Sequence, residues 1–147
     1  MPTQTNIGPL ETKVTAFKLI ARDALRMNMI SPRLSNLSDL QNRITDLSKG
    51  QAAYNHSAIV ANYEISKLDK EHPDYEEKKA KLLERVKNAT EYSEDITKQI
   101  AEVQKEIDEQ NTGIAKIESG ETKVSLDDLN SLTERLVKED AFKQVNQ

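Results

Sequence analysis

The sequence contains no cysteine, no tryptophan and only two histidines among its 147 residues. Without cysteine the chain can form no disulfide, no thiolate nucleophile and no cysteine-ligated zinc site. Neither His56 nor His72 belongs to a metal-binding motif such as H-E-x-x-H, and the four glycines stand apart, so there is no glycine-rich phosphate loop. We therefore expect no catalytic residue, no metal and no cofactor. His72 is interpreted as a residue of a turn or a helix cap.

Long apolar runs and a basic surface are missing too. No run approaches the roughly 20 apolar residues of a membrane span, and residues 1–5 lack the basic start and apolar core of a signal peptide. The net charge is −4, and no clustered basic surface with interleaved aromatic residues is present, as a nucleic-acid partner would require. We expect a soluble protein without a membrane span or a nucleic-acid partner, located in the cytoplasm or assembled in a virion.

What the sequence does contain is two long apolar stripes with a period of 3.5 residues. Such a repeat over several heptads is typical of a coiled coil, because only a supercoiled helix keeps the stripe facing one partner. The first stripe consists of Leu37, Leu40, Ile44, Leu47, Gln51, Tyr54, Ala58, Ala61, Ile65 and Leu68. The second consists of Tyr75, Lys79, Leu82, Val86, Ala89, Ser93, Ile96, Ile100, Val103, Ile107, Gln110, Ile114 and Ile117.

Residues 72–74, His-Pro-Asp, favour a chain reversal between the two stripes. Antiparallel pairing then places residues whose numbers add to about 143 opposite one another. Tyr54 falls near Ala89, so a large residue faces a small one, and Gln51 falls near Ser93 as a polar seam layer. This complementarity favours a hairpin within one chain over the alternative, pairing between chains. The predicted fold class is all-α: a long antiparallel coiled-coil helical hairpin, with shorter N- and C-terminal helices packed at its open end.

The predicted organisation is a polar tail at residues 1–9 and a single helical domain at residues 10–147. Ser31 and Pro32 resemble an N-cap and first helical residue, Gly120 a C-terminal cap, and residues 125–128 an acidic capping box. Gly50 is compatible with a helix end, but the heptad phase continues across it and favours a continuous helix. We expect helices at about residues 10–30, 32–70, 73–118 and 125–143.

The expected helix at residues 10–29 is broadly apolar, with Phe17, Ile20 and Met27 as candidate interface residues. Lys18, Arg22 and Arg26 form a basic line along it at a spacing of four residues. This line is compatible with a helix that binds a membrane surface or an acidic partner. We favour the other interpretation, a helix packed on the acidic second arm of the hairpin.

Residues 50–63 contain no Lys, Arg, Asp or Glu, although 31% of the chain is charged. Opposite the first stripe, this stretch presents a second apolar face, and a helix that is apolar on two faces is normally buried on both. Either another element of the chain covers this face or another subunit does, and we favour a subunit. The predicted protein-interface residues are Ala52, Ala53, His56, Ile59, Val60 and Tyr63.

The expected function is that of a non-enzymatic structural or adaptor subunit of a larger protein assembly, such as a virion component, a scaffold or a part of a secretion apparatus. Its partners would be proteins, either copies of itself or other subunits. The alternative is a small acidic inhibitor or chaperone that binds one cellular protein. It would use the acidic residues of the second arm: Glu91, Glu94, Asp95, Glu102, Glu106 and Glu109.

Overall fold

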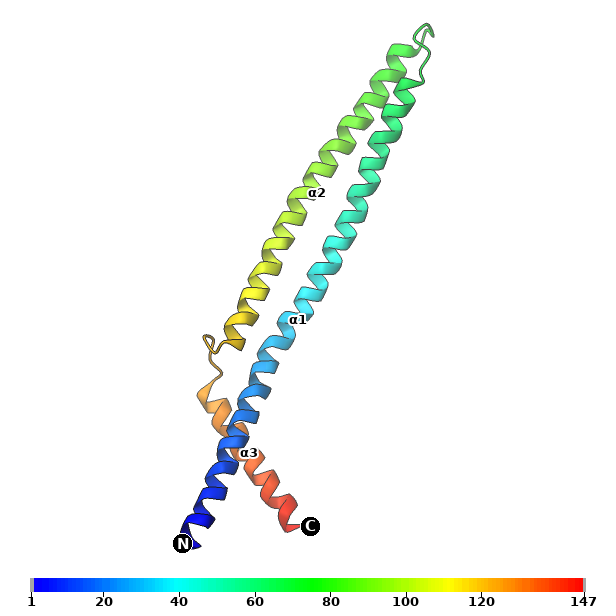
Figure 1. Cartoon of the computed structure of the whole chain (residues 1–147). Coiled ribbons are helices and arrows are strands. Elements are labelled where there is room, and N and C mark those ends of the chain that lie inside the picture. The colour runs from blue at the N-terminus through cyan, green and yellow to red at the C-terminus, as the bar shows by residue number, and fades with distance from the viewer. Residues whose placement is uncertain (1, 147) are drawn as a thin grey trace. The chain divides into compact units, whose positions relative to one another are not determined.

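The computed structural model describes the backbone of residues 2–146 and the side chains of residues 10–146. Over that range the chain is all-helical, as predicted, and contains three helices: α1 (Pro2–Ser66), α2 (Tyr75–Glu118) and α3 (Leu126–Val145) (Figure 1). The chain divides into a terminal unit, Met1–Ser35 with Gln110–Gln147, and a central unit, Asn36–Glu109. Helices α1 and α2 each contribute to both units.

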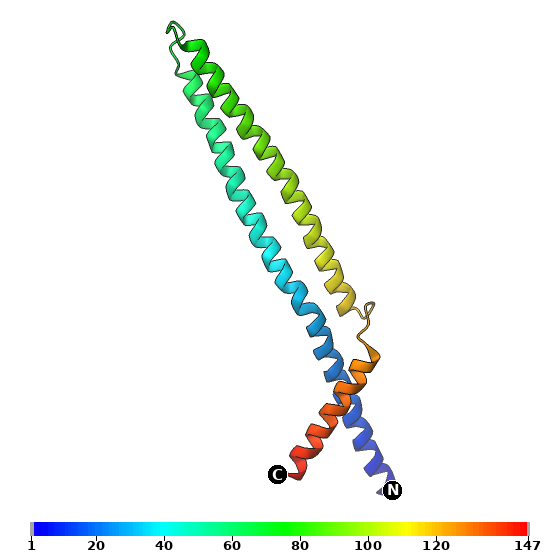
Figure 2. The same cartoon turned by 180° about the vertical axis from the view of Figure 1, so that it is seen from behind.

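In the central unit, the parts of α1 and α2 that belong to it lie side by side, as both views show (Figures 1 and 2). They run in opposite directions, because Gln51 hydrogen-bonds Ser93 while the later residue Ser57 bonds the earlier residue Arg85. Side chains of reduced exposure recur every three or four residues on both helices. On α1 these include Leu40, Ile44, Leu47, Gln51, Ala58, Ala61 and Ile65, and on α2 they include Leu82, Val86, Ala89, Ser93, Ile96, Ile100, Val103 and Ile107.

The connection between α1 and α2 is set by local hydrogen bonds. The N–H groups of Lys67 and Leu68 bond carbonyls three residues back, at 3.1 and 3.2 Å, and so tighten the end of α1. Helix α1 therefore ends at Ser66, short of the predicted residue 70. The Asp74 N–H donates to Nδ1 of His72 at 3.1 Å, and the Asp74 carbonyl accepts the first helical bond from Lys78. Because this side-chain bond competes with helix at residue 73, α2 begins at Tyr75.

The terminal unit contains the first part of α1, the last turns of α2, and α3. Helix α2 ends at Glu118, and Gly120 has a φ of 83°, the left-handed conformation expected for a C-terminal cap. The Ser125 hydroxyl accepts a hydrogen bond from the Asp128 N–H at 3.3 Å, which confirms the predicted N-cap of α3. The buried side chains of this unit are Ala21, Ile30, Ile117, Leu129 and Thr133.

The predicted helix boundary at Ser31 and Pro32 is wrong, because α1 continues through both residues. A proline inside a helix removes one hydrogen bond and costs about 3 kcal/mol. Tertiary contacts on either side offset this cost: Ile30 is buried, and Arg33 hydrogen-bonds Gln110 at 3.1 Å. Gly50 also lies within α1, so the prediction of a continuous helix there is confirmed.

Residues 2–9, predicted as a polar tail, have helical backbone in the structure. Pro2 is the first helical residue, where the missing N–H group has no intrahelical partner to lose. The sequence expectation rested on polarity and on the pair Gly8-Pro9, neither of which forbids continuation of a helix that later residues stabilise. Helix α1 therefore replaces the tail and the first two helices of the predicted organisation.

Candidate protein-interaction surfaces

The uncharged stretch of α1 lies in the central unit, and most of its outer face is open to solvent. Ile59 is 66% exposed and Tyr63 is 62% exposed, and Ala52, Ala53 and His56 are exposed as well. Val60, at the edge of the face, is half-buried. We call these six residues, Ala52, Ala53, His56, Ile59, Val60 and Tyr63, the open face. Within the central unit no element covers it, so its apolar side chains are available to a partner.

Gln51 and Ser93, the predicted polar layer, are brought together between α1 and α2. The Gln51 side-chain amide donates to the Ser93 carbonyl at 2.9 Å and to Oγ1 of Thr97 at 2.6 Å. The Ser93 hydroxyl donates to Oδ1 of Asn55 at 2.8 Å. None of these four side chains titrates near neutral pH. The layer is therefore suited to fixing the register of the two helices rather than to acid–base chemistry.

Asn55 and Thr97 were missed at the sequence level because they lie beside the stripes rather than on them. Each is four residues from the polar stripe residue on its own helix, Gln51 and Ser93. Residues four apart lie on one side of a helix. A search for polar residues at that spacing around a polar stripe position would have found both.

A pair of aromatic rings lies next to the polar layer. The rings of Tyr54 and Tyr92 stack with their centroids 5.1 Å apart and their planes 28° from parallel. Tyr54 was expected to lie near Ala89, and both residues line one cavity of about 350 Å³ together with Tyr92, while the Tyr54 side chain is 38% exposed. A stack of this kind contributes about 0.5–1.5 kcal/mol beyond burial. Tyr92 is off the stripe, so heptad spacing did not indicate it.

In the terminal unit the predicted interface residues are only partly covered. Phe17 is half-buried, while Ile20 and Met27 are 53% and 54% exposed. Of the basic line, Lys18 is exposed, whereas Arg22 and Arg26 are half-buried. These two arginines help to line a cleft of about 430 Å³ with residues that follow α2 and begin α3: Gly120, Lys123, Val124, Leu126 and Leu129. Part of the basic line is therefore enclosed by the terminal unit itself.

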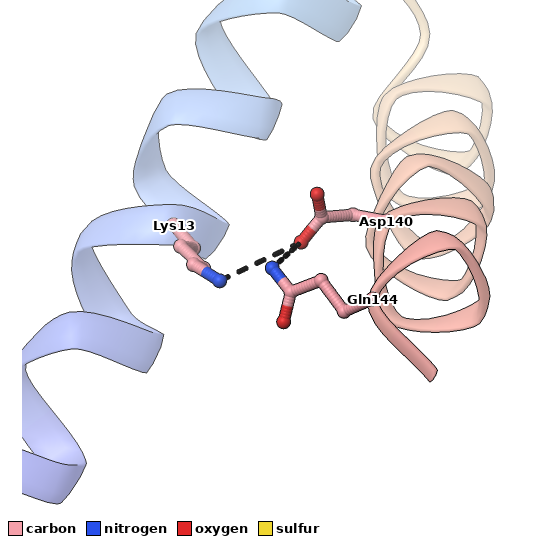
Figure 3. A network of polar contacts seen from close by, with 3 residues as sticks. All are labelled: Lys13, Asp140 and Gln144. Carbon is pink, nitrogen blue, oxygen red and sulfur yellow. Dashed lines mark hydrogen bonds and ion pairs between the residues drawn. The ribbon is translucent and has the colours of Figure 1, made fainter. Parts of the chain in front are cut away.

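An ion pair joins helix α3 to the beginning of α1 (Figure 3). Nζ of Lys13 lies 3.6 Å from Oδ2 of Asp140, and the side-chain amide of Gln144 donates to the same oxygen at 3.2 Å. The pair is partly exposed, so its contribution to stability is small, about 0–1 kcal/mol. No pattern in the sequence pointed to this contact, because the two residues lie at opposite ends of the chain.

Gly113 of α2 lies beneath the guanidinium group of Arg33 in the terminal unit. A Cβ at position 113 would collide with that group, and Arg33 also donates a hydrogen bond to the side-chain carbonyl of Gln110 at 3.1 Å. The absence of a side chain at Gly113 therefore leaves room for the arginine to cross α2.

No group of three or more His, Cys, Asp or Glu residues that could hold a metal ion is found among the described residues. Over the same range no helix combines the length and the hydropathy needed to cross a membrane. Comparisons of the chain with models of protein families, with curated proteins and with solved structures give no match.

Proposed function

We propose that this protein is a non-enzymatic structural or adaptor subunit of a larger protein assembly and that it acts through helix–helix contacts. The observation that carries this proposal is the open face, an uncharged apolar surface on a helix whose other side is already occupied by α2. Fully burying a side chain such as Ile59 stabilises a complex by roughly 1.5–3 kcal/mol. A virion, a scaffold and a secretion apparatus are all settings in which such a subunit would serve.

In this proposal α1 and α2 of the central unit form an antiparallel coiled-coil hairpin. Its support is the agreement between the stripes of the sequence and the residues of reduced exposure on both helices. The Gln51–Ser93 hydrogen bond adds a polar layer, which penalises any other register. The function of the hairpin is geometric: it holds the open face of α1 in a fixed orientation for a neighbouring subunit.

The alternative is a small acidic inhibitor or chaperone that binds one cellular protein. The observation in its favour is that the acidic side chains of α2 point to solvent: Glu91, Glu94, Asp95, Glu102, Glu106 and Glu109 are all exposed. Under this alternative, reversing the charge of Glu91, Glu94 and Asp95 weakens capture of the partner. Under the assembly proposal the same change has little effect on association.

The test of the assembly proposal is the solution mass of the purified chain by light scattering, with circular dichroism to follow helix content. The variant Ile59→Glu/Val60→Glu places two charges on the open face. The matched control is Leu83→Glu, because Leu83 is 47% exposed on α2 and lies outside the open face. We expect an oligomer in the wild type and the control, and a helical monomer in the double variant.

Two results would contradict the proposal. If the wild type is already a monomer and the double variant loses its helix content, the open face belongs to the chain's own core. If Leu83→Glu dissociates the protein as completely as the double variant does, association depends on general surface hydrophobicity rather than on the open face.

A further inference from the structure

Four residues of the open face, Ala52, His56, Ile59 and Tyr63, repeat at intervals of four, three and four. This is heptad spacing, so the open face is itself a coiled-coil stripe on the side of α1 away from α2. All four side chains are exposed in the structure. The residues at one end are small, and those at the other end are large.

That gradient makes the stripe complementary to a second copy of itself that runs in the opposite direction. If residues whose numbers add to about 115 lie opposite one another, each stripe position meets a different residue type. Ala52 then faces Tyr63 of the second copy, and His56 faces Ile59. Small residues meet large ones at both ends of the contact, as efficient packing requires. A parallel pair would instead stack Ala52 on Ala52 and Tyr63 on Tyr63, which leaves a void at one end and crowds the other.

A second row of residues beside the stripe shows the same complementarity in charge. Asp46, Ala53 and Val60 of α1 and Lys67, the first residue after its end at Ser66, recur every seven residues, so they follow one line along the helix and the turn that closes it. In the antiparallel arrangement this flanking line lies against the same line of the second copy, which runs in the opposite direction. Asp46 then lies near Lys67 of the second copy, and Ala53 lies near Val60. The two-fold axis repeats each contact, so an ion pair closes each end of the uncharged stretch.

We infer that the open face binds a second copy of this chain, α1 against α1 in antiparallel orientation, with a two-fold axis between His56 and Ile59. The inference rests on the proposed function and names the partner of the same surface. A two-fold axis requires a patch that is complementary to itself. Both the stripe and its flanking line meet that requirement in one register, although they are different sets of residues.

Cysteine cross-linking tests the orientation directly, because the chain has no native cysteine. An equimolar mixture of Ala52→Cys and Tyr63→Cys chains is expected to form the mixed disulfide dimer under mild oxidation. Ala52→Cys alone is expected to form none, since residue 52 lies eleven positions, about 16 Å along the helix, from its own copy. Disulfides need Cα atoms within about 7 Å. Ala101→Cys, at an exposed position on α2, is the control for random collisions.

The outcomes separate this inference from the proposed function. A disulfide in the mixture and not in either single-variant sample supports the antiparallel dimer. A disulfide with Ala52→Cys alone indicates a parallel pair and overturns the inference. If no sample cross-links beyond the Ala101→Cys control while light scattering still shows an oligomer, the inference fails and the assembly proposal stands. A wild-type monomer at the same concentration overturns the inference as well.

Charge exchange tests the register independently. Asp46→Lys and Lys67→Asp each place like charges opposite one another at both ends and are expected to weaken dimerisation by about two- to fivefold per lost pair. The double variant Asp46→Lys/Lys67→Asp restores opposite charges at both ends, so its dissociation constant is expected to return to the wild-type value. A double variant at least as weak as the weaker single one would overturn this register. Sedimentation equilibrium at low ionic strength gives the four dissociation constants.

Discussion

The two apolar stripes of α1 in the central unit have similar spacing but different surroundings. The stripe containing Ala58 and Ala61 faces α2, and Ala61 has no exposed surface. The stripe containing Ile59 and Tyr63 lies on the other side of the same helix and is largely exposed. Helix α2 presents a single apolar stripe and therefore covers only one side of α1. Heptad spacing thus indicates that a surface will be covered, but it does not say which molecule covers it.

The largest expected difference between the two sides follows from the same substitution at two neighbouring residues. Ala61→Glu places a charge in the fully buried layer and is expected to lower the free energy of unfolding by about 3 kcal/mol or more. Ile59→Glu places the same charge in solvent and should change the unfolding free energy of the monomer by about 0.5 kcal/mol or less. Urea titrations at low protein concentration, followed by circular dichroism, measure both. Equal losses would mean that the open face is part of the folded core.

Substitution of one polar residue on each side of α1 is expected to give a smaller difference in the free energy of unfolding. Gln51→Ala removes hydrogen bonds to Ser93 and Thr97 and is expected to cost about 1–2 kcal/mol of stability. His56→Ala removes an exposed side chain from the opposite side and should cost about 0.5 kcal/mol or less. The comparison is made by urea denaturation under the conditions used for the glutamate variants. A Gln51→Ala protein as stable as the wild type would show that the polar layer contributes nothing to this register.

A modest gain in stability is expected at Gly50, beside the covered stripe. A Cβ built there would lie 3.8 Å from Cδ1 of Ile96, an ordinary van der Waals distance. Gly50→Ala is therefore expected to raise stability by about 0.5–1 kcal/mol through helix propensity alone. Gly120→Ala is the opposing control, because a φ of 83° strains any side chain, and it should lose about 1 kcal/mol. A thermal melt that shows a loss for Gly50→Ala would mean that α1 and α2 pack more closely here.

Several local features could be predicted because their causes lie within a few residues of one another. Gly120 and Ser125 were indicated as caps by residue type, and both adopt the expected conformation or hydrogen bond. The buried residues of α2, such as Ala89, Ile96 and Val103, all belong to the predicted stripe. In each case the pattern repeats within one helix, so no knowledge of a distant partner was needed.

The features that could not be predicted depend on residues far apart in the chain. Pro32 was expected to begin a new helix, but the burial of Ile30 and the hydrogen bond from Arg33 to Gln110 keep α1 continuous. The Lys13–Asp140 ion pair joins residues from the two ends of the chain. At Pro32 local preference was the only information available, and the surrounding tertiary contacts outweighed it. The ion pair has no local pattern that would indicate it.

By itself, the sequence determined that this protein is helical, that Gly120 caps the end of α2, that Ser125 caps the start of α3, and which residues of α2 are buried. Those properties follow from hydrogen bonding and periodicity over one or two helical turns. Only the tertiary structure decided that α1 is one helix through Pro32, that Gln51 bonds Ser93 and Thr97, and that the stripe with Ile59 remains open. Each of these outcomes depends on which distant surface reaches a residue, and a repeat within one helix carries no information about that.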